Sequence, residues 1–243
     1  MKKILYFVPH QDDELLGYGL DIAMETKTGS ENVYVYLCTD GSSSGVRRML
    51  CDNNEACFIH QGKHQYDLSR EEFSKARDRE FVLSLVALGV KKENIKIYED
   101  RAVDGSLTFD YALKKMREEI KFSGSPDEIS IRAYAPYRKK PQQTDHSRLG
   151  LAAIELFENN EVGEIKLIVE NPELDFSVTD FPQHYFSKIS FDDDAKVKIT
   201  NACKAYRIWE PENGFYAIGY HSVYGEFVNY LTFPDMYAVI KSK

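Results

Sequence analysis

The stretch that decides the fold is residues 3–14, KILYFVPHQDDE, where an apolar run ends at Val8 and a polar turn begins at Pro9. An apolar run without alternation predicts a strand that is buried on both faces of a sheet. A helix is expected over residues 13–25, because apolar residues recur there at helical spacing. A buried strand that runs directly into a helix is typical of an α/β fold with a parallel sheet.

Strand and helix signals keep alternating as far as residue 170. Strands are expected over residues 32–39, 95–98, 129–134 and 165–169. Helices are expected over residues 69–88, 109–120 and 145–157, and Ser69 and Glu72 form a capping-box pattern at the first of them. This alternation predicts a Rossmann-like, doubly wound, mostly parallel sheet in residues 1–170.

Residues 171–243 differ from the rest of the chain because they are rich in aromatic side chains and hold the only tryptophan, Trp209. Residues 214–231 suggest short strands or a hairpin. The sequence contains no linker-like stretch, so we expect one domain over residues 1–243. Its core would span 1–170, and 171–243 would form an aromatic-rich C-terminal extension or cap.

The composition is that of an ordinary globular chain, with 243 residues, 29% charged residues and a net charge of −8. The negative charge argues against nonspecific binding to nucleic acid or to an anionic membrane surface. No apolar run reaches the roughly 18–20 residues of a membrane span, and the short run at the N-terminus lacks a signal-peptide cleavage site. The four cysteines contain no CxxC pair, which predicts free thiols in a reducing, cytoplasmic environment.

The turn after the first strand carries His10, Asp12 and Asp13. Ligands of open α/β sheets bind at the carboxyl ends of the strands, where this turn lies. Such a turn can direct His10 and Asp13 at one point, with Asp12 beside them. The alternative is that one of the two acids simply caps the helix, which leaves the histidine and the other acid unexplained.

A second polar segment, QTDH at residues 143–146, lies between a predicted strand and the next helix. One of its middle residues is expected to cap that helix, and His146 taken alone is more typical of a surface residue. In a doubly wound sheet, however, this loop opens at the same edge as His10 and Asp13. Two histidines and a carboxylate with an open coordination position suit a catalytic zinc ion.

These two segments resemble the PHPDDE and HPDH signatures of the PIG-L/LmbE-type N-acetylglucosaminyl deacetylases. Weaker similarities to the family are TDG at 39–41, RDRE at 77–80, LGV at 88–90 and DG at 104–105. The resemblance covers residues 2 to about 170, and only Lys204-Ala205-Tyr206 extends it faintly toward the C-terminus.

The resemblance implies a metal-dependent hydrolase that removes an N-acyl group, N-acetyl above all, from an amino sugar or glycoconjugate. The implied ligands of Zn²⁺, or of another divalent ion such as Fe²⁺, are His10, Asp13 and His146. Asp12 would act as the general base toward the attacking water. Asp145 could orient a metal ligand by a hydrogen bond, without itself binding the metal. Arg77 and Asp40 are the implied substrate contacts.

Two residues depart from the family pattern. Gln11 replaces a proline, which we expect to change only the rigidity of the turn. Gln143 replaces a histidine, and an amide can donate a hydrogen bond to an oxyanion but cannot supply a proton at pH 7. Either Asp12 carries all the proton transfers, or another histidine takes over, or the chain is an impaired homologue that binds a sugar or a protein partner. His221 is the favoured substitute acid, since residues 171–243 could fold over the site; the others considered are His60, His64 and His184.

Other features allow weaker predictions. Arg47 lies in a polar segment, 42–48, that could hold sugar hydroxyls or a phosphate, although a solvated loop is the plainer interpretation. The basic run at 138–140 could attract an anionic substrate, and Trp209 or Tyr224 could stack on a sugar ring or line a dimer interface. A nucleotide-binding Rossmann enzyme is disfavoured because the GYG at 17–19 lacks the third glycine of the fingerprint. The expected partner is therefore a small amino-sugar substrate, with homo-oligomerisation left open.

Overall fold

A computed structural model describes residues 2–52, 56–57, 59–60, 62–136, 144–169, 186–189, 192–232 and 236–242. Its centre is a seven-stranded sheet with the order β5-β2-β1-β6-β7-β11-β8. The strands are β1 (Lys3–Val8), β2 (Val33–Thr39), β5 (Ile95–Ala102), β6 (Ile129–Tyr134), β7 (Glu164–Val169), β8 (Phe186–Ile189) and β11 (Met236–Ser242). The first five run parallel, and β11 lies antiparallel between β7 and β8.

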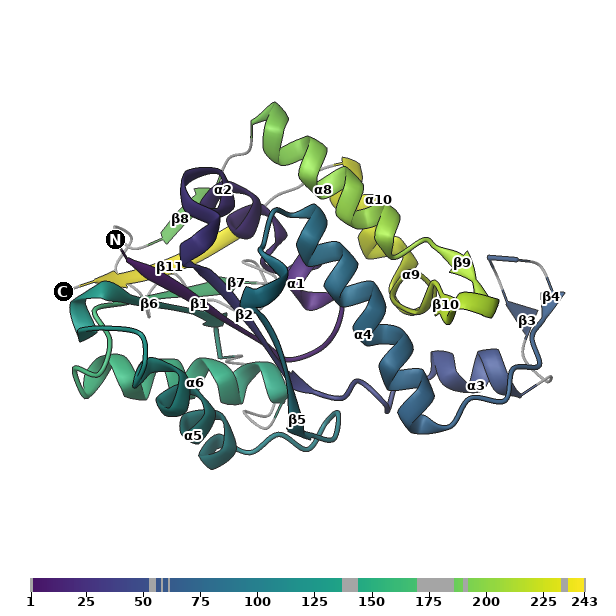
Figure 1. Cartoon of the computed structure of the whole chain (residues 1–243), viewed down its shortest axis with the longest axis horizontal. Coiled ribbons are helices and arrows are strands. Elements are labelled where there is room, and N and C mark those ends of the chain that lie inside the picture. Colours follow the sequence, from purple (N-terminus) through teal and green to yellow (C-terminus); the bar gives the residue numbers. More distant parts are fainter. Residues whose placement is uncertain are drawn as a thin grey trace.

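Helices cover both faces of this sheet, as a doubly wound fold requires (Figure 1). The helices are α1 (Asp13–Leu16), α2 (Gly19–Gly29), α3 (Val46–Cys51), α4 (Arg70–Ala87), α5 (Phe109–Ile120), α6 (Asp145–Glu158), α8 (Asp193–Ala205), α9 (Ile218–Ser222) and α10 (Tyr224–Thr232). Short 3₁₀ turns span Ser30–Asn32, Lys92–Asn94, Pro126–Glu128 and Pro211–Asn213. Figure 1 shows α5 and α6 on one face and α2, α4 and α8 on the other. The predicted α/β, mostly parallel architecture is confirmed.

Two small ribbons lie outside the main sheet. They pair β3 (Ala56–Cys57) with β4 (Gly62–Lys63), and β9 (Trp209–Glu210) with β10 (Phe215–Tyr216), each antiparallel. Both ribbons and α3 gather at the end of the molecule opposite the two termini (Figure 1).

The first strand is buried on both faces, as its composition predicts. Tyr6 and Val8 belong to the core under α2, α4 and α8, whereas Leu5 and Phe7 belong to the core under α5 and α6. Each fully buried side chain of this size contributes roughly 1.5–3 kcal/mol to folding. The strand therefore holds the two helical layers together.

The predicted capping box at the start of α4 is confirmed. Ser69 Oγ accepts the N–H of Glu72 at 3.2 Å, and Glu72 Oε2 accepts the N–H of Ser69 at 2.9 Å. Thr144 likewise caps α6, because its hydroxyl accepts the N–H of Ser147 at 3.2 Å. Caps of this kind are worth about 1 kcal/mol each.

The predicted helix over residues 13–25 is divided into α1 and α2 at Gly17 and Tyr18. A Cβ atom at Gly17 would lie only 1.7 Å from the hydroxyl oxygen of Tyr134. Glycine is needed there because the β6 side chain passes so close to the backbone. This break has a tertiary origin, which a helical pattern in the local sequence does not reveal.

The prediction of strands over residues 214–231 is wrong for most of that segment, which forms α9 and α10. Tyr220, Val223, Phe227 and Tyr230 follow one another at helical spacing and pack on the same core. The aromatic content favoured a strand, but the spacing of the aromatic residues is that of a helix face.

The described parts of the C-terminal extension are built into the fold. Strands β8 and β11 extend the main sheet, and Ile199 and Tyr206 of the α8 region are buried in the same core as Tyr6. Among the described residues, no helix combines the length and apolar character needed to cross a bilayer.

A buried ionic network joins α2 to the sheet. Arg132 on β6 lies 3.1 Å from Asp21 Oδ2 and 3.0 Å from Glu164 Oε1, and Glu164 also accepts a hydrogen bond from Ser130. Burial raises the pKa of Glu164, but Ser130, Arg132 and Lys2 outweigh it and bring that pKa to about 2. Glu164 is therefore ionised in the folded protein even in mild acid.

Candidate metal and catalytic site

A pocket of about 390 Å³ opens at the carboxyl end of β1. The turn after β1, the loop after β2, α4, α6 and the junction of α9 with α10 all contribute to it. The lining residues are His10, Asp12, Asp13, Leu16, Ser44, Gly45, Arg77, Asp104, His146, Ser222, Val223 and Glu226. The pocket thus lies at the sheet edge where α/β folds bind ligands.

The carboxylate of Asp13 lies between two imidazoles. His10 Nδ1 is 3.1 Å from Asp13 Oδ2, and His146 Nε2 is 3.1 Å from either oxygen of that carboxylate. One ligand atom from each residue lies within 4.8 Å of the others. Burial opposes ionisation of Asp13, but His146 and His10 hold its pKa well below the usual range. The two sequence segments therefore converge as predicted, and the donor set suits zinc.

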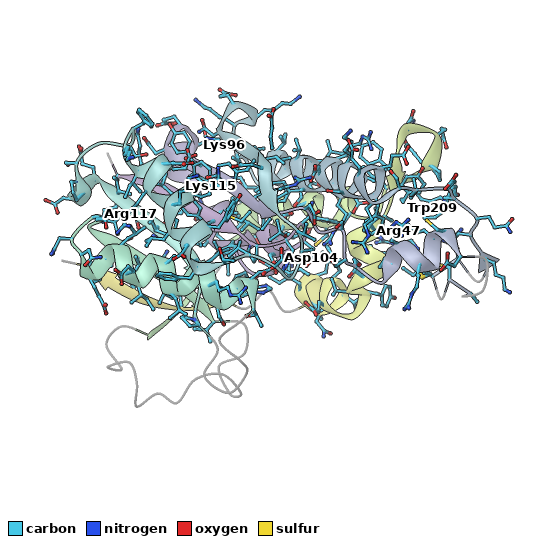
Figure 2. The ribbon with its side chains drawn as sticks, turned by 90° about the horizontal axis from the view of Figure 1, so that it is seen from below. Arg47, Lys96, Asp104, Lys115, Arg117 and Trp209 are labelled. Atoms are coloured by element: carbon cyan, nitrogen blue, oxygen red, sulfur yellow. The ribbon has the colours of Figure 1, made fainter. Side chains whose placement is uncertain are left out.

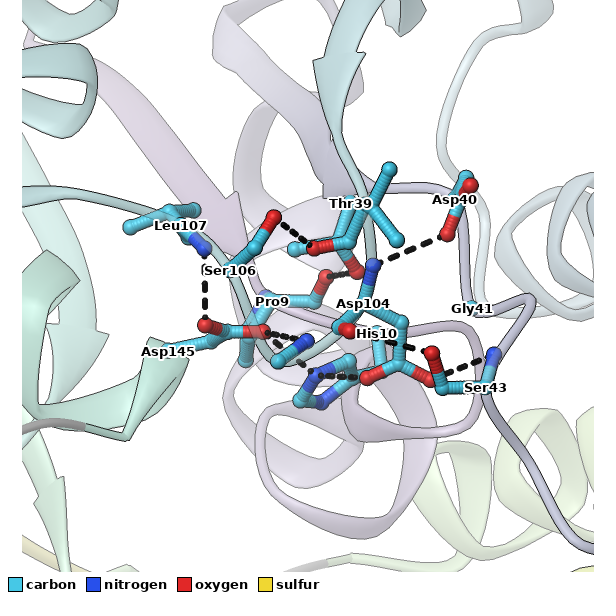
Figure 3. A network of polar contacts seen from close by, with 12 residues as sticks. Pro9, His10, Thr39, Asp40, Gly41, Ser43, Asp104, Ser106, Leu107 and Asp145 are labelled. Carbon is cyan, nitrogen blue, oxygen red and sulfur yellow. Dashed lines mark hydrogen bonds and ion pairs between the residues drawn. The ribbon is translucent and has the colours of Figure 1, made fainter.

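The other ring nitrogen of His10 faces two carboxylates. His10 Nε2 is 3.2 Å from Asp104 Oδ1 and 3.1 Å from Asp145 Oδ2 (Figure 3). Asp145 in turn accepts backbone N–H groups from Gly105 at 2.7 Å and from Leu107 at 3.1 Å. Both Asp145 oxygens are thus engaged, so this residue is better suited to orient His10 than to bind an ion itself.

The sequence analysis missed Asp104 and Tyr134, which both contact the proposed metal ligands. Asp104 was quoted only as part of a family turn, yet it contacts His10 directly. Tyr134, at the end of β6, places its hydroxyl 3.1 Å from Asp13 Oδ1 and its ring edge against His146. A tyrosine within an apolar strand gives no local sign of such a role.

Asp12 has an unusual backbone and a largely buried carboxylate. Its φ of 108° is one that residues other than glycine rarely adopt. Its N–H is held by Glu14 Oε2 at 2.9 Å, and its side chain makes no capping bond to α1. The simple capping interpretation is therefore wrong for Asp12. Burial raises the pKa of Asp12 to about 7, against the opposing effect of Arg77.

Arg77 is buried and holds the turn that carries Asp12. It donates to Gly41 O at 2.9 Å, to Gln11 O, and to Asp12 Oδ2 at 3.0 Å. Gly41 has a φ of +60°, and a Cβ there would lie 2.7 Å from the Arg77 guanidinium. These contacts make Arg77 a positioning residue for Asp12, and its predicted contact with substrate stays a prediction.

Gln11 does more than alter the rigidity of the turn, so that expectation is wrong. The side chain is fully buried, and its Nε2 donates to Asp78 Oδ1 at 2.8 Å and to Asp40 O at 3.3 Å. Asp78 is also paired with Arg101 of β5 at 2.8 Å. Gln11 therefore connects the turn after β1 to α4 and β5.

The predicted substrate contacts Asp40 and Arg47 have other partners. Asp40 Oδ1 accepts N–H groups from Ser42 at 3.0 Å and from Asp104 at 2.9 Å. Arg47 Nε donates to Leu68 O at 3.0 Å. Neither residue is among those that line the pocket. Their substrate roles stay predictions.

His221, the predicted substitute acid, is buried beside the pocket but points elsewhere. Its Nδ1 lies 2.7 Å from Ala217 O, and its Nε2 lies 3.4 Å from His60 Nδ1. The next residue, Ser222, lines the pocket. Gln143, His184 and the basic run 138–140 lie outside the described residues.

Two buried carboxylates tie the C-terminal extension to the site. Glu14 accepts the Tyr206 hydroxyl at 2.7 Å, so the faint family match at 204–206 includes a contact with the first motif. Glu80 accepts the N–H groups of Ile218 at 2.7 Å and Gly219 at 3.0 Å. The extension is thereby fixed next to the pocket, where it also contributes Glu226, which the sequence analysis did not single out.

Comparisons with known proteins give one family match and two solved structures with a similar fold. The model of the PIG-L family, described as GlcNAc-PI de-N-acetylase, matches residues 5–157. The structure of N,N'-diacetylchitobiose deacetylase from Pyrococcus horikoshii is similar, with a TM-score of 0.54, 20% identity, and coverage of 87% of this chain and 75% of the other. The 4-carboxy-2-hydroxymuconate hydratase GalB from Pseudomonas putida KT2440 is also similar, with a TM-score of 0.55, 14% identity, and coverage of 100% and 97%. No curated protein sequence matches the chain significantly.

Proposed function

The chain belongs to the PIG-L family, the GlcNAc-PI de-N-acetylases, and we propose that it is a metal-dependent hydrolase that removes an N-acetyl group from an amino sugar or glycoconjugate. One observation carries this proposal. The Asp13 carboxylate lies between His10 Nδ1 and His146 Nε2, and Asp12 lines the same pocket. Metal ligands and a general base thus share one small-molecule pocket, whose volume falls in the range usual for such sites.

His10, Asp13 and His146 are the proposed metal ligands. Two imidazole nitrogens and one carboxylate suit Zn²⁺ with an open coordination position, and they also accept Fe²⁺. When bound, zinc lowers the pKa of a coordinated water to about 7 and polarises the amide carbonyl. Asp104 and Asp145 hold the His10 ring so that Nδ1 faces Asp13.

Asp12 is the proposed general base. It accepts a proton as water adds to the amide carbonyl carbon, and a positioned base of this kind contributes about 10²–10⁴-fold to the rate. The C–N bond then breaks to give acetic acid and a free amine. The proton held on Asp12 returns to the leaving nitrogen, so atoms and charge balance. Arg77, 3.0 Å from Asp12 Oδ2, keeps the carboxylate directed toward the pocket.

Gln143 is the proposed donor to the developing oxyanion, in the place of the family histidine. Its amide N–H can stabilise negative charge on oxygen but cannot protonate the amine. Glu226, which lines the same pocket from α10, is a second carboxyl group available for that protonation. The site can therefore complete the reaction without the missing histidine.

The fold alone does not choose the reaction, because the two similar structures are named as a deacetylase and a hydratase. Membership of the family favours deacetylation. The test is to incubate zinc-loaded protein with N-acetylglucosaminides, nucleotide sugars and glycan fragments, and to measure the acetate and primary amine released. Equal amounts of both products support the proposal. Release of neither from any substrate would favour the non-catalytic, binding homologue.

A further inference from the structure

A second group of metal-binding side chains lies outside the pocket. Cys57, His60 and His64 come from the ribbon of β3 and β4, and His221 comes from α9. One ligand atom from each of the four lies within 4.8 Å of all the others. We infer that these four residues form a structural zinc site that joins the ribbon to α9.

The three distances from His60 Nδ1 to the other donor atoms match those of a tetrahedral zinc ion. Zinc–sulfur and zinc–nitrogen bonds of about 2.3 and 2.05 Å place tetrahedral S···N pairs about 3.6 Å apart and N···N pairs about 3.3 Å apart. Cys57 Sγ lies 3.5 Å from His60 Nδ1. That nitrogen lies 3.3 Å from His64 Nε2 and 3.4 Å from His221 Nε2.

Hydrogen bonding alone does not account for this arrangement. His60 Nδ1 has three heteroatoms within 3.5 Å, yet a ring nitrogen offers only one N–H or one lone pair. One cation at the centre of the four residues would engage every donor at once.

Neighbouring groups hold the donor side chains in place, as hydrogen bonds to the ligands do at other metal sites. The Nδ1 of His221 faces Ala217 O at 2.7 Å, which fixes the tautomer and leaves Nε2 free to bind metal. The backbone N–H of His60 donates to Cys57 Sγ at 3.3 Å, a bond that stabilises a thiolate. The Trp209 ring packs against His60 and His64, with centroid distances of 4.2 and 4.8 Å. Trp209 therefore packs directly against two of the four proposed ligands.

The donor set also indicates the kind of ion. One thiolate and three imidazoles select zinc over magnesium or calcium, and four protein ligands leave no open position for chemistry. The spacing C-x₂-H-x₃-H at 57–64 brings three of them from one short segment. His221 lies beyond the residues 5–157 matched by the family model, so this set is not part of that match.

The proposed ion sits where it can stabilise the wall of the catalytic pocket. Glu80 holds the first residues of α9, and His221 lies at the other end of this helix. The next residues, Ser222 and Val223, line the pocket. Figure 2 places Trp209, which packs against His60 and His64, toward one end of the long axis and Asp104 of the catalytic pocket nearer the middle. The two sites are thus distinct but share α9.

Titration of metal-free wild-type protein with Co²⁺ tests this inference without depending on the folding of a variant. A near-ultraviolet thiolate-to-cobalt charge-transfer band is expected, because Cys57 is the only sulfur ligand in either proposed site. The band should persist in His146→Ala and in the matched cysteine control Cys51→Ser, and vanish in Cys57→Ser. Cys51 is a fair control because its Sγ faces Leu68 O, outside the cluster.

Zinc content by elemental mass spectrometry gives a second reading. Wild type should hold two ions per chain, and Cys57→Ser and His146→Ala should each lose a different one. Absence of the thiolate band from wild type, or equal zinc in wild type and folded Cys57→Ser, would overturn the inference. A wild type that shows the thiolate band but holds a single ion, retained in His146→Ala, would instead count against the catalytic site and leave this one standing.

Discussion

The Nε2 atom of His10 lies 3.1 Å from the Asp145 carboxylate, although 135 residues separate the two in sequence. This contact joins the turn after β1 to the start of α6 and leaves His10 Nδ1 facing Asp13. The doubly wound sheet brings the two segments together because both follow the carboxyl ends of adjacent parallel strands, β1 and β6. The catalytic role proposed above depends on this convergence.

Replacement of Asp12 by asparagine should abolish most of the hydrolysis and leave the metal content unchanged. An amide cannot accept the proton from water, so kcat/KM should fall by about 10²–10⁴-fold. Steady-state assays of released amine, with zinc measured on the same samples, provide the check. Asp110→Asn, at an exposed position of α5, is the matched control. Full activity in Asp12→Asn would rule out the proposed base.

Substitution of Arg77 by lysine separates two roles for this residue. Lysine cannot reach Gly41 O, Gln11 O and Asp12 together, so Asp12 should lose its position and kcat should fall by about 10–100-fold. KM should change little if Arg77 acts only through Asp12. A raised KM with kcat retained would show instead that Arg77 binds substrate, as the family resemblance implies.

Gln143→His restores the family residue and tests whether the chain is an impaired enzyme. If Gln143 already serves as the donor to the oxyanion, activity should stay within about tenfold of wild type or fall. The readout is kcat/KM on the best substrate of the screen. A gain of about 10²-fold or more, the size of a general-acid contribution, would favour the impaired homologue.

Acid stability should depend on Glu164. The pKa of this group is about 2 in the folded protein and about 4.5 when unfolded, so the unfolded chain binds more protons between these values. Its stabilising effect is complete above pH 4.5 and is lost as the pH falls toward 2. From pH 5.5 to 3, wild type should lose up to about 2 kcal/mol more free energy of unfolding than Glu164→Gln. Urea unfolding at the two pH values measures this difference, and parallel losses in both proteins would refute the assignment.

Much of the fold could be predicted from local sequence patterns. The apolar run of β1, the Ser69 capping box and the alternation of strands and helices each have a cause within a few residues of the chain. The break at Gly17 does not, because it depends on the Tyr134 hydroxyl from a distant strand. The aromatic segment that forms α9 and α10 was assigned by composition, whereas the spacing of its residues decides its structure.

The site residues also fall into two groups, those that local motifs predict and those that only the tertiary fold brings together. His10, Asp13 and His146 lie in recognisable motifs, and their meeting follows from the order of parallel strands. Asp104 and Tyr134 contact this set only through the tertiary fold. Four cysteines without a CxxC pair predicted free thiols and gave no sign of a metal site. The structure brings the Cys57 segment to a histidine more than 160 residues away, which no local pattern could reveal.

Metal content of untagged wild type and of His146→Ala, measured side by side by elemental mass spectrometry, tests the central claim most directly. His146 and His10 flank the Asp13 carboxylate, so loss of one imidazole should empty this site. The variant is expected to hold one zinc or similar ion per chain fewer than wild type and to lose deacetylation. Equal metal content in the two proteins, or a wild type without metal after reconstitution with zinc, would contradict the account.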